Sequence, residues 1–178
     1  MLNSYRLKSH PPDKLLINQL RSVAISTEQT VEKVYPIMST SIPLPCLRRV
    51  AYVTGATHDL GKATVFFQQY ILDKDATPQD PFLKSHSMIS SLYCSWITIN
   101  DIFQILQYRD FSTIAASLAI QGHHGSLKRP TMYLKGLDFF EDESRKIFSR
   151  QVDSLIENID EVEGITQELN LPSFKKFT

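Results

Sequence analysis

The sequence predicts an all-α fold, and three observations predict it. Apolar residues recur at intervals of three and four over most of the chain, which is the period of an amphipathic helix. No run of five or more residues alternates cleanly between apolar and polar types, as a half-buried strand would. The length of 178 residues suits one domain. We therefore expect a single compact helical bundle over residues 1–178, with a piece of a longer chain as the alternative.

Capping and breaking residues indicate the helix ends in the first part of the chain. Asp13 is a favourable N-cap after two prolines, and Thr27 or Thr30 can cap a short second helix that ends at Pro36. A third helix begins with a proline suited to a first turn, and Gly61 separates it from a fourth. The helical ranges expected from these signals are 13–24, 27–36, 45–58 and 62–72.

Similar signals indicate the helices of the remaining chain. Ser85 is an N-cap for a long helix, and Asp110 or Ser112 starts another that ends at Gly122. A charged amphipathic segment follows as one helix or as a pair split near Gly164. The expected helical ranges are 86–107, 110–122 and 141–169, the expected loops are 73–81 and 125–130, and the apolar tail 171–178 needs a surface to pack on.

The charge balance excludes one class of function. Lys and Arg number 19 and so do Asp and Glu, whereas a free-standing, non-specific DNA binder is usually basic. A nucleic-acid substrate would therefore be delivered by another component. The N-terminus has no apolar signal region, and no apolar run approaches the roughly 20 residues of a membrane span. We expect a soluble cytoplasmic protein with no membrane partner, in which Cys46 and Cys94 stay reduced.

Four of the five histidines lie at expected helix ends, beside Gly, Ser or Asp residues. One of them begins the string H-D-L-G-K, one opens the helix after Ser85, and two are adjacent between glycines. A single histidine on a helix is more often a surface or core residue than a ligand, and we assign His10 to that class. The concentration of the others predicts a metal site. The candidate metal ligands are His58, Asp59, His86, His123 and His124.

The chemistry of these residue types explains the prediction. Neutral imidazole binds divalent Fe, Mn, Ni and Zn, and one carboxylate can bridge two metals. Two metals roughly 3.5–4 Å apart can clamp the attacking and leaving oxygens of a phosphodiester. Lys62 can neutralise charge on the phosphate, and Gly61 would let the chain turn so that Lys62 faces the metals. The candidate catalytic residues are therefore Asp59 and Lys62.

The sequence resembles the HD phosphohydrolase superfamily and, more narrowly, the HD nuclease domain of the type I CRISPR-associated nuclease–helicases. The strings T-H-D-L-G-K-A-T-V-F-F-Q and A-I-Q-G-H-H-G-S-L carry most of the resemblance. Together the matching stretches cover about two-thirds of the chain. They are Lys8–Pro11, Leu15–Ala24, Thr57–Gln68, Ser85–Ser91 and Ala119–Leu127.

The resemblance implies a helical HD-domain bundle that degrades single-stranded DNA with a divalent transition metal, Fe, Mn or Ni. One metal would be held by Asp59, His86, His123 and His124, a set that is complete in this chain. The HD pair would support another metal together with an N-terminal His and a late Asp.

That other set is not complete in this chain. Gln19 stands where the resemblance places the N-terminal His, and an amide oxygen is a poor ligand for Fe or Ni. The downstream acidic candidates are set in a charged helical pattern typical of a solvated face. They are Asp138, Asp142, Asp153 and Asp160. We therefore expect one well-formed metal site, with a second only if a late Asp is recruited, from here or from beyond Thr178.

Several functions remain open at this point. The first is a metal-dependent DNase of CRISPR interference, active alone or only with partner chains. The others are a degenerate metal-binding interaction module and an HD nucleotide phosphohydrolase. The resemblance also implies partners: single-stranded DNA, a helicase domain or subunit, and an RNA-guided CRISPR surveillance complex. The motor would lie elsewhere, because the chain has no G-x-x-x-x-G-K-[ST] motif.

Overall fold

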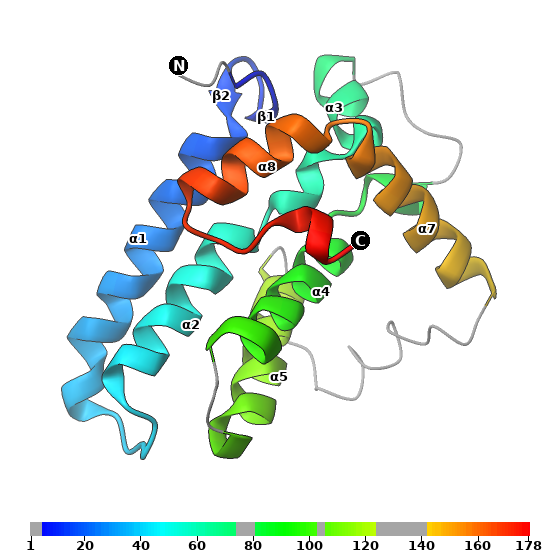
Figure 1. Cartoon of the computed structure of the whole chain (residues 1–178). Coiled ribbons are helices and arrows are strands. Elements are labelled where there is room, and N and C mark those ends of the chain that lie inside the picture. Colours follow the sequence, from blue (N-terminus) through cyan, green and yellow to red (C-terminus); the bar gives the residue numbers. More distant parts are fainter. Residues whose placement is uncertain (1–4, 74–80, 103–105, 124–141) are drawn as a thin grey trace.

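The computed structural model describes residues 5–73, 81–102, 106–123 and 142–178, and within them the fold is all-α as predicted (Figure 1). Short 3-10 turns (η1, η2, η3 and η5) and one π-helical turn (η4) connect or extend the helices. The α-helices are α1 (Leu16–Val34), α2 (Leu44–Thr57), α3 (Val65–Leu72), α4 (Ser87–Ile97), α5 (Leu106–Gly122), α7 (Asp142–Ile156) and α8 (Ile159–Glu168). The turns are η1 (Tyr35–Ile37), η2 (Leu60–Ala63), η3 (Pro81–Lys84), η4 (Thr98–Ile102) and η5 (Phe174–Lys176).

A two-stranded hairpin precedes α1 and was not predicted. Strand β1 (Lys8–His10) pairs antiparallel with β2 (Lys14–Leu15). The expected N-cap Asp13 lies in the turn between the strands, and α1 begins only at Leu16 because the two preceding residues pair with β1. Strands of two and three residues are too short to show alternation in the sequence.

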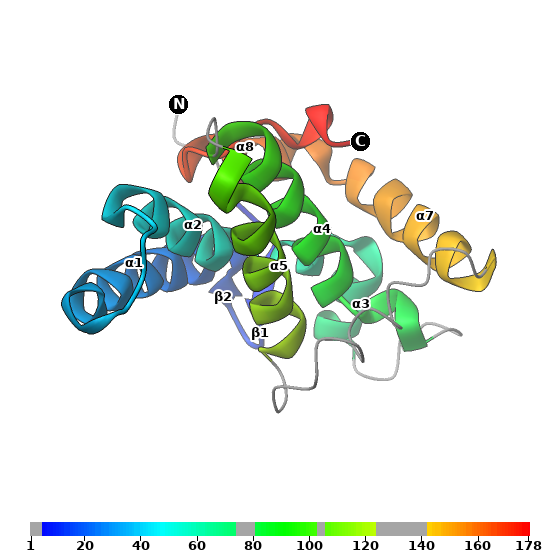
Figure 2. The same ribbon diagram turned by 90° about the horizontal axis from the view of Figure 1, so that it is seen from below.

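Helices α1 and α2 lie side by side, and α4 and α5 form a second pair next to them (Figures 1 and 2). The break expected at Thr27 or Thr30 is absent, because α1 is continuous through both. The Thr27 hydroxyl donates within its own helix to Val23 O and reaches Ala51 O at 2.8 Å. A Cβ at Gly55 would lie 2.6 Å from Thr27 Oγ1, so this glycine allows the close contact of the two helices.

The C-terminal segment forms a pair of helices, α7 and α8, as one of the two expectations had it. The split falls at Glu157–Asn158 rather than near Gly164, which lies inside α8. Buried Val162 and Ile165 on either side of this glycine hold α8 against the core. Helix α7 lies beside α3 and the η3 turn, on the far side of the molecule from α1 (Figure 1).

The apolar tail packs on the body of the protein. Phe174 is fully buried, and its ring meets that of Tyr93 on α4 at 4.9 Å between centroids. Tyr93 also donates its hydroxyl to the Pro172 carbonyl. Cys46 and Cys94 are both free, as expected. Within the described ranges, no helix is both long enough and apolar enough to cross a membrane.

Candidate metal centre

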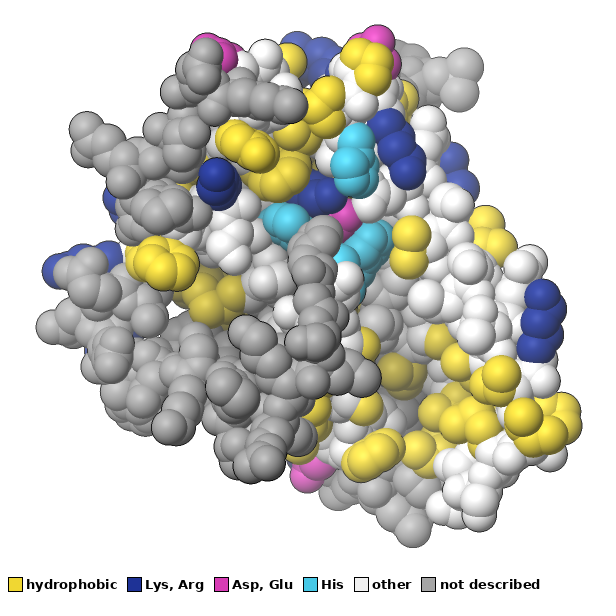
Figure 3. Space-filling model, turned by 180° about the vertical axis from the view of Figure 1, so that it is seen from behind, with side chains coloured by type: hydrophobic (Ala, Val, Ile, Leu, Met, Phe, Trp, Pro, Cys, Tyr) yellow, Lys and Arg dark blue, Asp and Glu magenta, His cyan; other side chains and the backbone are white. Residues whose placement is uncertain are grey.

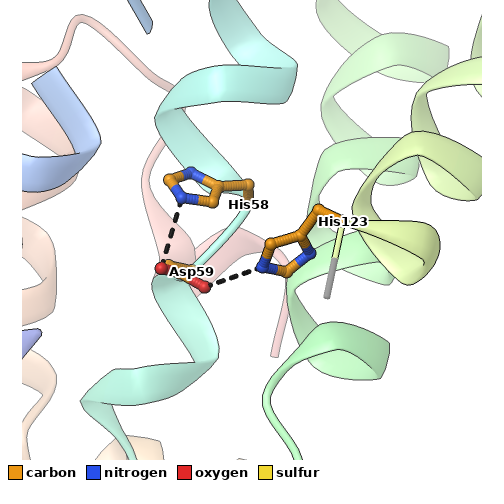
Figure 4. Close-up of side chains that lie close together, drawn as sticks. All are labelled: His58, Asp59 and His123. Atoms are coloured by element: carbon orange, nitrogen blue, oxygen red, sulfur yellow. Dashed lines mark hydrogen bonds and ion pairs between the residues drawn. The ribbon is translucent and has the colours of Figure 1, made fainter. Parts of the chain in front are cut away.

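The buried carboxylate of Asp59 is the centre of the candidate site, at the point where α2 ends and η2 begins. Only 1% of its side chain is exposed. Oδ1 lies 2.9 Å from His86 Nε2 and 3.1 Å from His123 Nε2. Oδ2 lies 3.2 Å from His58 Nε2 and 2.9 Å from Lys62 Nζ. Figure 4 shows His58 and His123 approaching the carboxylate from two sides.

Three helix ends bring these imidazoles together. His58 follows the last residue of α2, His86 is the N-cap of α4, and His123 follows the last residue of α5. A space-filling view shows histidine side chains around a partly visible acidic group on one face of the molecule (Figure 3). The structure therefore brings together residues that lie up to 65 positions apart in the sequence, His58 and His123.

Gly61 matters for this convergence, though for a different reason than the one expected. Its φ is not positive, so no special turn of the backbone requires glycine. A Cβ there would instead lie 2.4 Å from the His86 carbonyl oxygen. The Gly61 N–H also donates to Ser90 Oγ on α4 at 2.9 Å. Glycine thus allows η2, which follows His58 and Asp59, to pack in direct contact with the start of α4.

Backbone carbonyls fix the orientation of two of the imidazoles. His58 Nδ1 lies 2.7 Å from the Gly55 carbonyl oxygen, and His123 Nδ1 bonds to that of Ile120. A carbonyl only accepts, so each Nδ1 must donate its proton. In the form without a proton on Nε2, each ring directs a lone pair at an Asp59 oxygen 3.1–3.2 Å away. Two acceptors at that separation need a shared cation, either a proton or a metal ion.

The spacing of the donor atoms fits a metal ion. Three ligand atoms lie within 4.8 Å of one another, one from each of His58, Asp59 and His123. Metal–ligand bonds of about 2.1 Å place neighbouring ligand atoms about 3.0–3.4 Å apart in octahedral or tetrahedral geometry. The contacts of Asp59 with three imidazoles, 2.9–3.2 Å, lie close to that range. Nitrogen donors and one carboxylate suit Fe, Mn, Ni or Zn.

Gln19 lies in the same cluster, as its sequence position suggested. Only 8% of the residue is exposed. Its Nε2 donates to Asp59 Oδ2 and is 3.4 Å from His58 Nε2. Its Oε1 is buried and has no hydrogen-bond partner among the described residues. The amide thus occupies one side of the carboxylate and does so as a donor.

Lys62 is nearly completely buried, with 3% of its side chain exposed. Besides Asp59 Oδ2, its ammonium reaches the Ser9 carbonyl oxygen on β1 at 3.5 Å. It also lies 5.3 Å from the centroid of the Phe67 ring. A buried ammonium needs such a counter-charge, because removing one partner of a buried ion pair leaves an uncompensated charge. Lys62 and Asp59 therefore form a neutral pair at the base of the site.

The electrostatics prepare the metal-free site for ligand binding. Burial alone raises the pKa of Asp59, but hydrogen bonds from the three imidazoles outweigh burial and hold that pKa far below its ordinary value. Burial lowers the pKa of His86. Burial also lowers that of His123, but hydrogen bonds to Asp59 and to the Ile120 carbonyl raise it above the ordinary value. An ionised carboxylate and a neutral His86 are the forms that bind a metal.

Two further side chains, His10 and Phe67, lie near the site. His10 is exposed on β1, in line with the surface assignment, yet burial and then the charge of Lys62 lower its pKa, so it lies within electrostatic reach of the site. Phe67 is buried, and its ring meets His86 edge-on at 5.2 Å between centroids. Its neighbour Phe66 lies under the guanidinium of Arg150. The signal in the sequence that separated His10 from an ordinary surface histidine was its place in Lys8–Pro11, one of the stretches that carry the resemblance.

Not every predicted ligand lies in the part of the chain that the structure describes. His124 and Asp138 lie outside the described residues, as does the side chain of Asp142. Asp153 and Asp160 are exposed, as their charged helical pattern indicated, and Asp160 lies 3.9 Å from Lys175. In the part of the chain that the structure describes, no second carboxylate joins the group of His58, Asp59 and His123.

Comparison with known proteins gives one relative of note. The CRISPR-associated nuclease/helicase Cas3 of Haloferax volcanii is 29% identical over 168 residues. The match covers 86% of this chain but 16% of the relative, so the chain spans about a sixth of the relative's length. No family model and no solved structure matches. Over most of its length, this chain is therefore weakly similar to part of a CRISPR-associated nuclease/helicase.

Proposed function

We propose that this protein is a metal-dependent HD-family nuclease that cleaves single-stranded DNA in CRISPR interference. The observation that carries the proposal is the convergence of three imidazoles and Lys62 on the single buried carboxylate of Asp59. The weak similarity to a nuclease/helicase supports the same class of reaction. The fold does not require such a cluster for stability, because replacing a whole buried ion pair by apolar residues is often neutral or stabilising.

One divalent transition metal, Fe, Mn or Ni, is the proposed cofactor. Asp59, His86 and His123 would hold it, with His58 alongside and His124 completing the set. Bound there, such a metal lowers the pKa of coordinated water and polarises a phosphodiester. The Nδ1 bonds of His58 and His123 to backbone carbonyls keep both Nε2 atoms directed at the site.

Lys62 would act through the carboxylate. Its ammonium holds Asp59 Oδ2 at 2.9 Å, which leaves Oδ1 turned toward His86 and His123. The same positive charge partly balances the negative charge that a phosphodiester brings to the site. Because Lys62 is buried and bonded on two sides, orientation of Asp59 is its main proposed role.

The substrate strand would be supplied by other components. The chain has a net charge of zero, which does not favour tight binding of DNA by itself. A helicase domain or subunit and an RNA-guided surveillance complex are the proposed partners. The relative that this chain matches is named a nuclease/helicase, and it is about six times as long as the matched part.

A degenerate, metal-binding interaction module is the second candidate function. The observation that favours it is Gln19, an amide at a position where the resemblance calls for a metal-binding imidazole. An HD nucleotide phosphohydrolase would need a pocket for base and sugar beside the carboxylate. A nuclease should cut single-stranded DNA and leave mononucleotides unchanged, and a module should bind metal without cutting either.

The test is metal content and cleavage measured on the same sample, purified without oxygen or chelator. We expect about one metal per chain and cleavage of single-stranded DNA that chelator abolishes and Mn²⁺ or Fe²⁺ restores. A His123→Gln variant should lose most of both, because it removes one of the proposed metal-binding imidazoles. The His123 side chain is partly exposed, so its replacement leaves the core intact. Bound metal without cleavage, with and without a helicase partner, would favour the module. Absence of metal would contradict both.

A further inference from the structure

Three polar side chains on the C-terminal helices contact the backbone of both segments that carry site residues. Gln151 and Ser154 belong to α7, and Asn158 is the N-cap of α8. The spacing of three residues places Gln151 and Ser154 on one face of α7, and Asn158 lies just beyond the end of that helix. Gln151 and Ser154 are almost fully buried, with 1% and 2% exposure. A buried polar face of this kind costs free energy unless each group finds a partner.

The Gln151 amide is directed at the segment before His86. Its Nε2 lies within hydrogen-bond distance of the carbonyl oxygens of Phe82 at 3.1 Å, Leu83 at 3.2 Å and Ser85 at 2.5 Å, and its two N–H groups are shared among them. These carbonyls belong to η3 and to the residue that links it to α4. A single buried amide therefore gathers three backbone acceptors directly before the histidine.

The two following residues hold the segment after Lys62. Asn158 Nδ2 donates to the Ala63 carbonyl oxygen at 2.8 Å, and Ser154 Oγ accepts from Val65 N–H at 2.6 Å. These are the end of η2 and the first residue of α3. These polar side chains thus contact the chain just after Lys62 and just before His86.

We propose that Gln151 is a positioning residue for His86 and that this polar face of α7 holds the two site segments in register. The proposal rests on the proposed function, because His86 matters only if it binds the metal. Fixing the Ser85 carbonyl removes freedom one residue before His86, whose Nε2 must stay 2.9 Å from Asp59 Oδ1. Partners of this outer kind typically change metal affinity by about 10- to 100-fold.

A volume-matched substitution, Gln151→Met, removes the hydrogen bonds to these carbonyls and keeps the packing. The matched control is Gln167→Met, the same substitution at an exposed position of α8. Two quantities are compared in wild type and both variants at a temperature where all are folded. One is the ¹⁵N chemical shift of the His86 ring in the metal-free protein. The other is the dissociation constant for Co²⁺, followed through the visible spectrum of the bound ion.

We expect Gln151→Met to shift the His86 ring signal and to weaken Co²⁺ binding about tenfold or more, while Gln167→Met matches wild type. A purely structural role would lower the unfolding temperature without changing either quantity in the folded protein. Wild-type ring shift and affinity in Gln151→Met would overturn the proposal. If the His86 signal moves but wild type binds no Co²⁺, the positioning role stands and the proposed metal-dependent function fails.

Discussion

The two oxygens of Asp59 face different surroundings. Oδ1 faces imidazoles from α4 and α5, at 2.9 and 3.1 Å. Oδ2 faces the ammonium of Lys62 at 2.9 Å and the Gln19 amide, in addition to His58. A divalent ion is attracted to the first side, whereas on the second it meets a fixed positive charge and an N–H donor. The difference indicates how one carboxylate can favour a single metal over a bridged pair.

Removing the carboxylate breaks both sides of the comparison and has the largest expected effect. Asp59→Ala should abolish metal binding and cleavage together. It also leaves the buried Lys62 ammonium without its partner, which costs about 3–5 kcal/mol of stability. Urea unfolding of the metal-free protein measures that cost. Cleavage that persists in a folded Asp59→Ala protein would contradict the proposed role of this residue.

The destabilisation of Asp59→Ala can be separated from its chemistry. The double variant Asp59→Ala/Lys62→Met removes the charge pair as a unit, so it should recover much of the lost stability and none of the metal binding. Recovery of metal binding in the double variant would mean that the imidazoles alone form the site.

Altering only the Oδ2 side should have a smaller effect. Lys62→Met should slow cleavage by about 10- to 100-fold and leave close to one metal per chain, because the ligands on the Oδ1 side remain. Metal content and the single-turnover cleavage rate are measured on one preparation, so that slower chemistry can be distinguished from loss of the metal. Loss of the metal itself would show that Lys62 is needed to build the site rather than to orient it.

Changing the amide beside Oδ2 should sharpen the comparison further. Gln19→His puts an imidazole in place of an amide whose Nε2 lies 3.4 Å from His58 Nε2, where it could help to bind a second metal. We expect the metal content to rise above one per chain, toward two. Gln19→Leu, which removes the amide without offering a ligand, is the matched control and should leave the metal content unchanged. An unchanged count in Gln19→His would mean that the missing acidic ligand, not Gln19, limits the second metal.

The side chains that meet in the candidate site could be predicted from the sequence, and the residues that hold their backbone segments in place could not. His58, Asp59, Lys62, His86 and His123 stand out because rare residue types recur beside Gly or Ser at helix ends, and the structure brings all five together. The helical class was equally predictable, because amphipathic periodicity is a local property.

Backbone-directed contacts left no comparable trace in the sequence. Gln151 and Asn158 stand in a segment whose pattern indicated a charged amphipathic helix or pair of helices. Their partners are backbone carbonyl oxygens, which every residue has. The residue type at the partner position therefore gives no sign of the contact. The role of Gly61 was misread for the same reason, since its neighbour is the backbone of His86 rather than a side chain.

The smallest expected effect concerns pH on the Oδ1 side. Hydrogen bonds raise the pKa of His123 against the opposing effect of burial, whereas burial lowers that of His86. A metal must displace the His123 proton, so affinity should fall as pH drops through that raised pKa, beginning above the ordinary value of about 6.5. His86 is already neutral there and adds no loss until lower pH. Co²⁺ titrations from pH 8 to 6 should show a loss of up to about tenfold per pH unit, and this onset should move to lower pH in His123→Gln. An onset that stays in place would assign the competing proton to another group.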